Sequence, residues 1–194
     1  MRLPSWLAAF GLGFAFFGMS PSPGAAWTEA GAAPKATAEG GSHQLNALQG
    51  CMNQWLFNGV WRVKVLKVES ITKEFVNYPG YGVTIQVRNG SKKTTSMPYT
   101  GVADGGTLVL DDGNTLELDT EPMIAWHPYF YKDLPPSAGF TFTLDYYLPN
   151  KPDSVPKPQK WLLEVDPKKE GTTAPRYTTA EPSVRVDLRC DKGA

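Results

Sequence analysis

Apolar and polar residues alternate one by one through most of the chain after Trp55, and this pattern constrains the fold most. A period of two residues places successive side chains on opposite faces of a β-strand, whereas a helix repeats every 3.6 residues. The longest alternating run extends from Phe140 to Leu148. Shorter alternating segments lie at residues 61–68, 83–87, 108–118, 161–165 and 184–190. The chain is therefore predicted to consist mainly of β-strands.

The strands are short, and 17 prolines and 19 glycines separate them. The alternation slips by one residue after Val65, which indicates a β-bulge or a change of sheet. Asp111-Asp112-Gly113-Asn114 is typical of a hairpin turn. One short helix is predicted within residues 44–58, and no segment after residue 60 has a helical period. We predict an all-β fold, an immunoglobulin-like antiparallel β-sandwich of about 7–9 strands, with a closed barrel as the alternative.

The N-terminal residues have the composition of a secretory signal peptide. Arg2 precedes an uncharged apolar run, Leu7–Gly18, and small residues follow it at Gly24-Ala25-Ala26. The run is shorter than the roughly 20 residues of a spanning helix, so cleavage is favoured over retention as an anchor. The predicted organisation is a signal peptide, a flexible tether and one domain, at residues 1–26, 27–46 and 47–192. The predicted location is secreted, periplasmic or associated with the cell envelope.

The two cysteines, Cys51 and Cys190, lie near the two ends of the predicted domain. Cys190 falls on the apolar phase of the last predicted strand, so its side chain is expected to point inward. An even number of cysteines in an exported chain favours a disulfide over two free thiols. A zinc site is not predicted, because His43 and His127 are the only histidines available beside this pair. No cofactor is predicted.

The charge balance excludes whole classes of function. Lys and Arg total 19, Asp and Glu total 19, and the formal net charge is +0. A nucleic-acid binder or a polybasic membrane-surface protein needs a basic surplus, so neither is predicted. No transmembrane segment is predicted after signal cleavage. The expected partner is a protein or a polymer of the envelope or extracellular space.

The strongest candidate site is an aromatic segment between predicted strands. Its members are Trp126, His127, Tyr129, Phe130 and Tyr131, with Tyr147 as an outward neighbour on the next strand. Rings with polar tips clamp peptides or stack on sugars, so this segment predicts a binding surface. A carbohydrate-binding module that uses Trp126, Tyr129 and Tyr131 is the alternative. Half of these rings could instead pack against the core.

A cluster of acidic residues leaves two further alternatives open. Asp111, Asp112 and Asp119, with Asp104 and Glu117 nearby, could hold calcium or serve an enzyme. The same residues are ordinary in turns. Only one histidine, His127, lies in the predicted domain, and no Gly-x-Ser-x-Gly motif is present, so a hydrolase triad is not predicted.

Asn89-Gly90-Ser91 matches an acceptor for N-linked glycosylation. Asn-Gly is also a strong turn signal, and it follows the strand at 83–87. We interpret the triplet as a turn.

Four segments resemble the DUF4352 family of exported bacterial immunoglobulin-like domains of unknown function, and one of them, Phe140–Leu148, is similar to its later long strand. Residues 58–69 are similar to its opening strand, residues 82–90 to its next core strand, and residues 134–137 to its later proline turn. Ser137 stands where the family more often has Gly. The resemblance covers residues 55–165 and implies a sandwich fold, export and no recognised catalytic residues. The resulting hypothesis is an exported, non-catalytic binding module.

Overall fold

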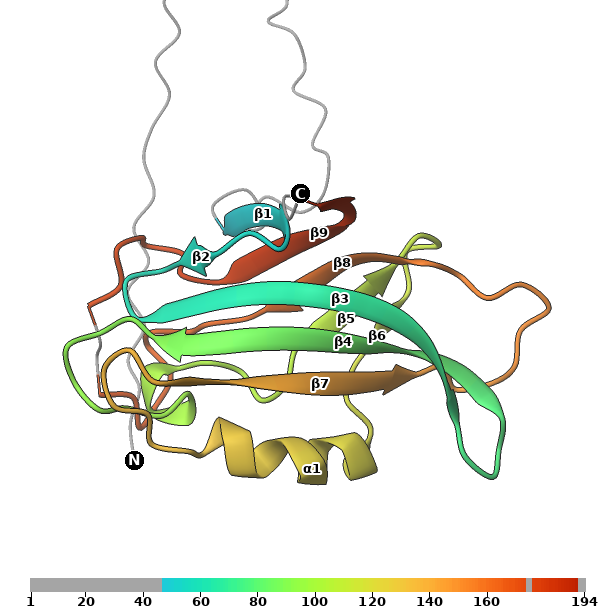
Figure 1. Cartoon of the computed structure of the whole chain (residues 1–194), viewed down its shortest axis with the longest axis horizontal. Helices are drawn as coiled ribbons and strands as arrows, with labels where there is room; N and C mark the ends of the chain where they lie inside the picture. Colours follow the sequence, from blue (N-terminus) through green and yellow to red (C-terminus); the bar gives the residue numbers. More distant parts are fainter. Residues whose placement is uncertain (1–46, 174–175, 192–194) are drawn as a thin grey trace, which may run out of the picture. The chain divides into compact units, whose positions relative to one another are not determined.

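The fold is a sandwich of two β-sheets (Figure 1). The computed structural model describes residues 47–173 and 176–191, so the predicted signal peptide and tether lie outside the described residues. The elements are β1 (Leu48–Met52), β2 (Leu56–Phe57), β3 (Trp61–Lys73), β4 (Tyr78–Asn89), a 3₁₀ turn η2 (Pro98–Thr100), β5 (Thr107–Leu110), β6 (Thr115–Leu116), α1 (Thr120–Phe130), β7 (Gly139–Tyr147), β8 (Pro158–Leu163) and β9 (Val184–Asp191).

One sheet has the strand order β1-β9-β8-β5-β6 and the other β2-β3-β4-β7. All neighbouring strands pair antiparallel except β1 and β9, which run parallel. Leu108 pairs with Leu116, so the hairpin predicted around residues 111–114 is present. The prediction of an all-β sandwich of about nine strands is confirmed.

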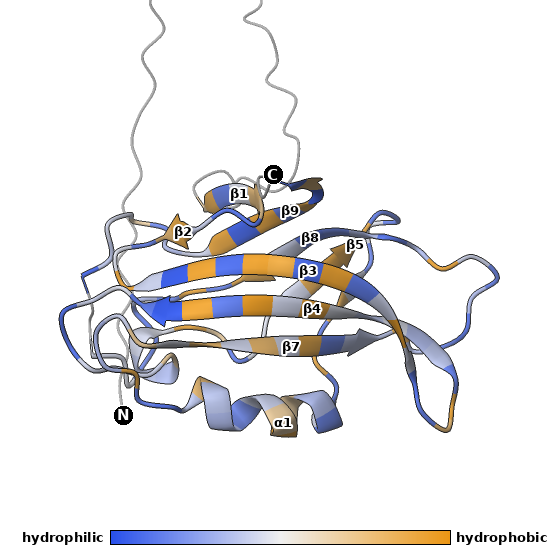
Figure 2. Cartoon of the chain, viewed as in Figure 1, coloured by the Kyte–Doolittle hydropathy of each residue, from blue (hydrophilic) through white to orange (hydrophobic). Residues whose placement is uncertain are grey.

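Strands β3 and β4 form the longest pair of the structure and show how alternation builds the core (Figure 2). Val63, Val65 and Val83 point inward and are fully buried. The pairing register shifts between Val65 and Lys67, which confirms the predicted irregularity at this position. A bulge of this kind turns the strand and restores the inward phase at the next apolar residues.

Two buried tryptophans donate hydrogen bonds in the core, and one of these bonds joins the two sheets. Trp161 of β8 donates from Nε1 to the hydroxyl of Tyr146 on β7 at 2.9 Å, and both side chains are fully buried. Trp61 of β3 donates from Nε1 to Oγ1 of Thr100 at 2.8 Å. Burial raises the pKa of Tyr146 well above its ordinary value, so its hydroxyl stays protonated. These buried polar groups are therefore satisfied across the sandwich.

The chain crosses between the sheets at both lateral edges. At one edge β1 of the five-stranded sheet leads directly into β2 of the four-stranded sheet. The helix predicted within residues 44–58 is therefore wrong, because pairing with β9 and β3 holds this segment as strands. At the other edge β6 leads through α1 into β7.

Helix α1 was not expected from the sequence, which contains Pro122 and Pro128. Pro122 lies in the first turn, where a backbone N–H has no partner within the helix. Asp119 is the N-cap, and its side chain accepts a hydrogen bond from the backbone N–H of Thr120. Pro128 lies near the C-terminal end, where it removes one hydrogen bond. Within the described residues no helix is long and apolar enough to cross a membrane.

Cys51 and Cys190 form the predicted disulfide, which joins β1 to β9 across a sequence separation of 139 residues. The adjoining Asn53 donates from its backbone N–H to the carbonyl of Val65 at 2.8 Å and from Nδ2 to Asp191 at 2.9 Å. The first and last described strands are thus tied to each other and to β3.

Replacing both cysteines by alanine should destabilise the fold strongly. A loop of this length restricts the unfolded chain by about 5 kcal/mol in the chain-entropy model. Denaturant unfolding of Cys51→Ala/Cys190→Ala should show a loss of unfolding free energy that approaches this value. The reduced wild-type protein serves as the control and should match the variant. Equal stability of the oxidised wild type and the variant would contradict the prediction.

Candidate functional site

The predicted aromatic segment forms the second half of α1 and its C-cap, Tyr131, and its rings divide between core and surface. Trp126 is 0% exposed and Phe130 is 3% exposed. The Trp126 ring lies 5.7 Å and 5.5 Å from the rings of Phe140 and Phe142 on β7. The expectation that Trp126 and Phe130 contact a ligand is therefore wrong, because both rings fill the edge of the sandwich.

The other predicted members lie nearer the surface. Tyr129 is half-buried, and its ring packs against Phe142 at 4.5 Å. Tyr131 is exposed. Tyr147 is half-buried, and Lys73 Nζ lies 5.4 Å from the centroid of the Tyr147 ring. Burial raises the pKa of Tyr147. Because Trp126 is buried, the stacking platform of Trp126, Tyr129 and Tyr131 is not formed as predicted.

The outward side of α1 carries a second apolar stripe. Ile124 is 65% exposed and Tyr131 is 58% exposed, with the exposed Pro128 between them. Residues spaced by three and four positions lie on one helix face, so these three side chains form a continuous strip. The helix is consequently apolar both toward the core and toward solvent, which obscured its period in the sequence.

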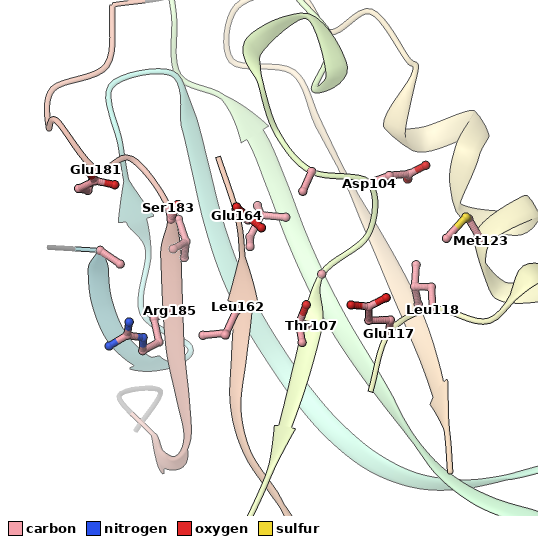
Figure 3. A pocket seen from close by; sticks show the side chains of 15 residues that line it. Asp104, Thr107, Glu117, Leu118, Met123, Leu162, Glu164, Glu181, Ser183 and Arg185 are labelled. Carbon is pink, nitrogen blue, oxygen red and sulfur yellow. The ribbon is translucent and has the colours of Figure 1, made fainter. Parts of the chain in front are cut away.

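A groove lies next to α1 on the outer face of the five-stranded sheet (Figure 3). Its cavity measures about 500 Å³. Met123 of α1 and Leu118 border one side, and Leu162 of β8 lies on the floor. Asp104, Glu117, Glu164 and Glu181 supply carboxylates, and Arg185 supplies a cation. The lining therefore has an excess of negative charge.

His127 and Asp104 form a pair beside this groove. Nε2 of His127 lies 2.8 Å from Oδ2 of Asp104, and the imidazole ring meets the Tyr131 ring edge-on. A hydrolase triad also needs a hydroxyl or thiol on the second imidazole nitrogen. Within the described residues, no such hydrogen bond to His127 is present. The pair holds α1 against the loop that carries Asp104.

The acidic residues considered for calcium do not converge. Asp111 accepts the backbone N–H of Lys157, and Asp112 accepts Asn114 within the turn. Asp119 caps α1 and pairs with Lys73, whose hydrogen bond holds the pKa of the Asp119 carboxyl below its ordinary value. Among residues 47–173 and 176–191, no group of three or more potential ligands is placed to hold a metal ion.

The sequence did not indicate the groove, because its carboxylates come from four separate segments of the chain. Only Asp104 and Glu117 belonged to the acidic cluster noted there. Asp104 and Glu117 lie near Glu164 because the strands follow the order β8-β5-β6, and alternation alone does not determine that order.

Comparison with known proteins gives no relative: no protein-family model, curated protein or solved structure matches the chain. The resemblance to the DUF4352 family accordingly stays a prediction. Functional inference rests on the geometry of the described residues.

Truncating Trp126 and Tyr131 should separate the core side of α1 from its exposed side. Trp126→Ala should lower the free energy of unfolding by about 3–5 kcal/mol, because it leaves a cavity beneath β7. Tyr131→Ala should lower it by about 1 kcal/mol or less, because the ring is mainly in solvent. Denaturant unfolding measures both values, and similar losses would refute this division of α1.

Proposed function

We propose that the protein is an exported, non-catalytic interaction module that binds a protein partner. The contact region, called here the docking surface, consists of Ile124, Pro128 and Tyr131 together with the adjoining groove. The exposed apolar stripe of α1 is the observation that carries this proposal. A helix with apolar residues toward two opposite sides is normally covered on both. On this helix the core covers one side only.

The groove indicates the chemistry of the partner. Carboxylates of Glu117, Glu164 and Glu181 surround a floor that includes Leu162. Complementary charge steers association and fixes orientation, while buried apolar anchors provide most of the affinity. The expected partner therefore presents an apolar segment flanked by lysine or arginine residues.

Export rests on two features. Residues 1–26 have the composition of a signal peptide, and we propose that they are removed. The Cys51–Cys190 bridge is of a type that persists in oxidising compartments. Both features support secretion or retention at the cell envelope, and a protein partner would be met in the same place.

Affinity capture from the envelope fraction and culture fluid of the producing cells tests the proposal. Ile124→Ser/Tyr131→Ser should lose the captured partner, with affinity falling about tenfold or more, because two apolar anchors are removed. The matched control is Phe75→Ser/Val76→Ser, which alters two exposed apolar residues of the β3–β4 turn. The control should retain the partner.

A second variant tests the charge of the groove. Glu117→Gln/Glu164→Gln should weaken binding of the same purified partner and reduce the salt dependence of that binding. Titration calorimetry with that partner measures both effects. Equal retention by the docking-surface variant and the wild type would refute the proposal. Equal loss from the Phe75/Val76 control would show unspecific adhesion and would also refute it.

A further inference from the structure

Six cationic side chains gather at the end of the sandwich where β3 begins and β4 ends. This group, called here the basic surface, consists of Arg62, Lys64, Arg88, Lys92, Lys93 and Arg176. Arg62 and Lys64 lie on β3, Arg88 lies on β4, and the lysine pair follows in the next loop. Of the ion pairs found in the described parts of the chain, none includes a member of this group.

Two of the cations are direct neighbours on adjacent strands. Arg62 pairs in register with Arg88 on the outer face of the four-stranded sheet, and Lys64 lies two residues further along. Side chains at such positions have Cβ atoms about 5 Å apart, and like charges there are destabilising. Because no described carboxylate forms an ion pair with these side chains, positive potential is concentrated on this part of the surface.

Aromatic rings hold these cations in place. The guanidinium of Arg62 lies 4.5 Å from the Phe57 ring centroid. Lys64 Nζ and the guanidinium of Arg88 lie 4.8 Å and 5.3 Å from the Trp55 ring. Cation–π contacts of this kind limit side-chain motion. The charged groups are therefore presented in a partly fixed arrangement.

A cavity of about 720 Å³ continues the basic surface beyond the end of β4. Lys92, Lys93 and Arg176 line it, together with the hydroxyl residues Ser91 and Thr94, and the described residues of the lining include no carboxylate. Gly90 lines the cavity and lies next to the ring of Phe57. A Cβ atom added to Gly90 would lie only 2.5 Å from the Phe57 Cε2. Cations on the sheet and cations in the cavity thus form one surface.

The loop that carries the lysine pair is held by a buried side chain. Asn89 is 0% exposed, and its Nδ2 donates to the carbonyls of Lys93 and Leu134 at 2.8 Å and 2.7 Å. Its Oδ1 accepts the backbone N–H of Ser91 at 2.8 Å. Asn89 is therefore a structural residue of the turn and not a glycosylation acceptor. The loop is preorganised before any ligand binds.

We propose that the basic surface binds a linear polysaccharide that carries carboxylate or sulfate groups. Cations fixed on a sheet match a chain of repeated negative groups, and the hydroxyls of the cavity offer hydrogen bonds to sugar hydroxyls. Tyr99, which is 56% exposed, directly precedes Thr100 of the cavity lining. The site is distinct from the docking surface.

A polysaccharide fits these observations better than a membrane or a nucleic acid. Tyr99 is the one large exposed apolar residue adjoining the cavity among the described residues, so the surface lacks a group of side chains that would insert into lipid. A base that stacked on Phe57 or Trp55 would compete with the cations that already contact these rings.

Affinity electrophoresis and titration calorimetry of the oxidised protein test the proposal. Polygalacturonate and dextran sulfate are the probes, and neutral dextran, duplex DNA and phosphatidylserine vesicles are the comparisons. We expect saturable binding to at least one acidic polysaccharide and binding that weakens as salt rises. Lys92→Gln/Lys93→Gln should reduce the affinity by about tenfold, because two charges of the cavity are lost.

Two further variants make the result specific. Lys151→Gln/Lys157→Gln is the matched control, since it removes the same charge from another exposed loop and should leave the affinity unchanged. Arg88→Gln should weaken binding and leave the thermal midpoint of the ligand-free protein nearly unchanged, because relief of the repulsion from Arg62 offsets loss of the contact with Trp55. A residue with a purely structural role would change the midpoint and not the affinity alone.

Three outcomes would overturn the proposal. One is the absence of binding to both acidic polysaccharides. Another is an equal loss of affinity in the Lys151/Lys157 control, which would show an unspecific charge effect. The third is tighter binding to the vesicles or to DNA than to either polysaccharide, which would assign the surface to another class of ligand. All three leave the docking surface of α1 untouched, so they are distinguishable from failure of the proposed function.

Discussion

A sandwich of two sheets buries one face of each sheet and leaves two lateral sides open, and the closing of these sides governs the rest of this structure. At one side the chain passes from β1 to β2, and the Cys51–Cys190 bridge joins β1 to β9. At the other side α1 inserts Trp126 against Phe140 and Phe142 of β7. The aromatic rings of α1 thus keep water from the inner faces at one edge, whereas the disulfide fastens β1 to β9 within the five-stranded sheet at the other.

Closure by a helix has a consequence for function. A helix that seals an edge has one side in the core and one side in solvent, and solvent normally favours polar residues on the outer side. In α1 the outer side carries Ile124 and Tyr131. The helix is also fixed from outside, because Asp119 caps it and Asp104 holds His127. The apolar stripe therefore lies on a rigid support, which lowers the entropic cost of binding a partner.

Alternation predicted the sandwich because burial of one strand face is a local property that shows in Val63, Val65 and their neighbours. The bridge was predictable because Cys190 falls on the inward phase of its strand. Helix α1 was missed because Pro122 and Pro128 argue against a helix, although their positions in the helix make both tolerable. Trp126 was assigned to a binding surface for a related reason. Without the helix, the sequence does not show which residues of segment 126–131 face the core and which face solvent.

The charge balance shows how a correct count can support too broad a conclusion. The net charge of +0 describes the field at long range, but charges in salt solution act over about 8 Å. Within that distance a ligand meets local groups, and these are segregated. Carboxylates gather in the groove beside α1, whereas the charged residues among the described lining of the cavity beyond β4 are two lysines and an arginine. The pairing of Arg62 with Arg88 depends on strand register, which the sequence does not reveal. Neutrality therefore excludes attraction of the whole chain to a polyanion, but it does not exclude a site for one.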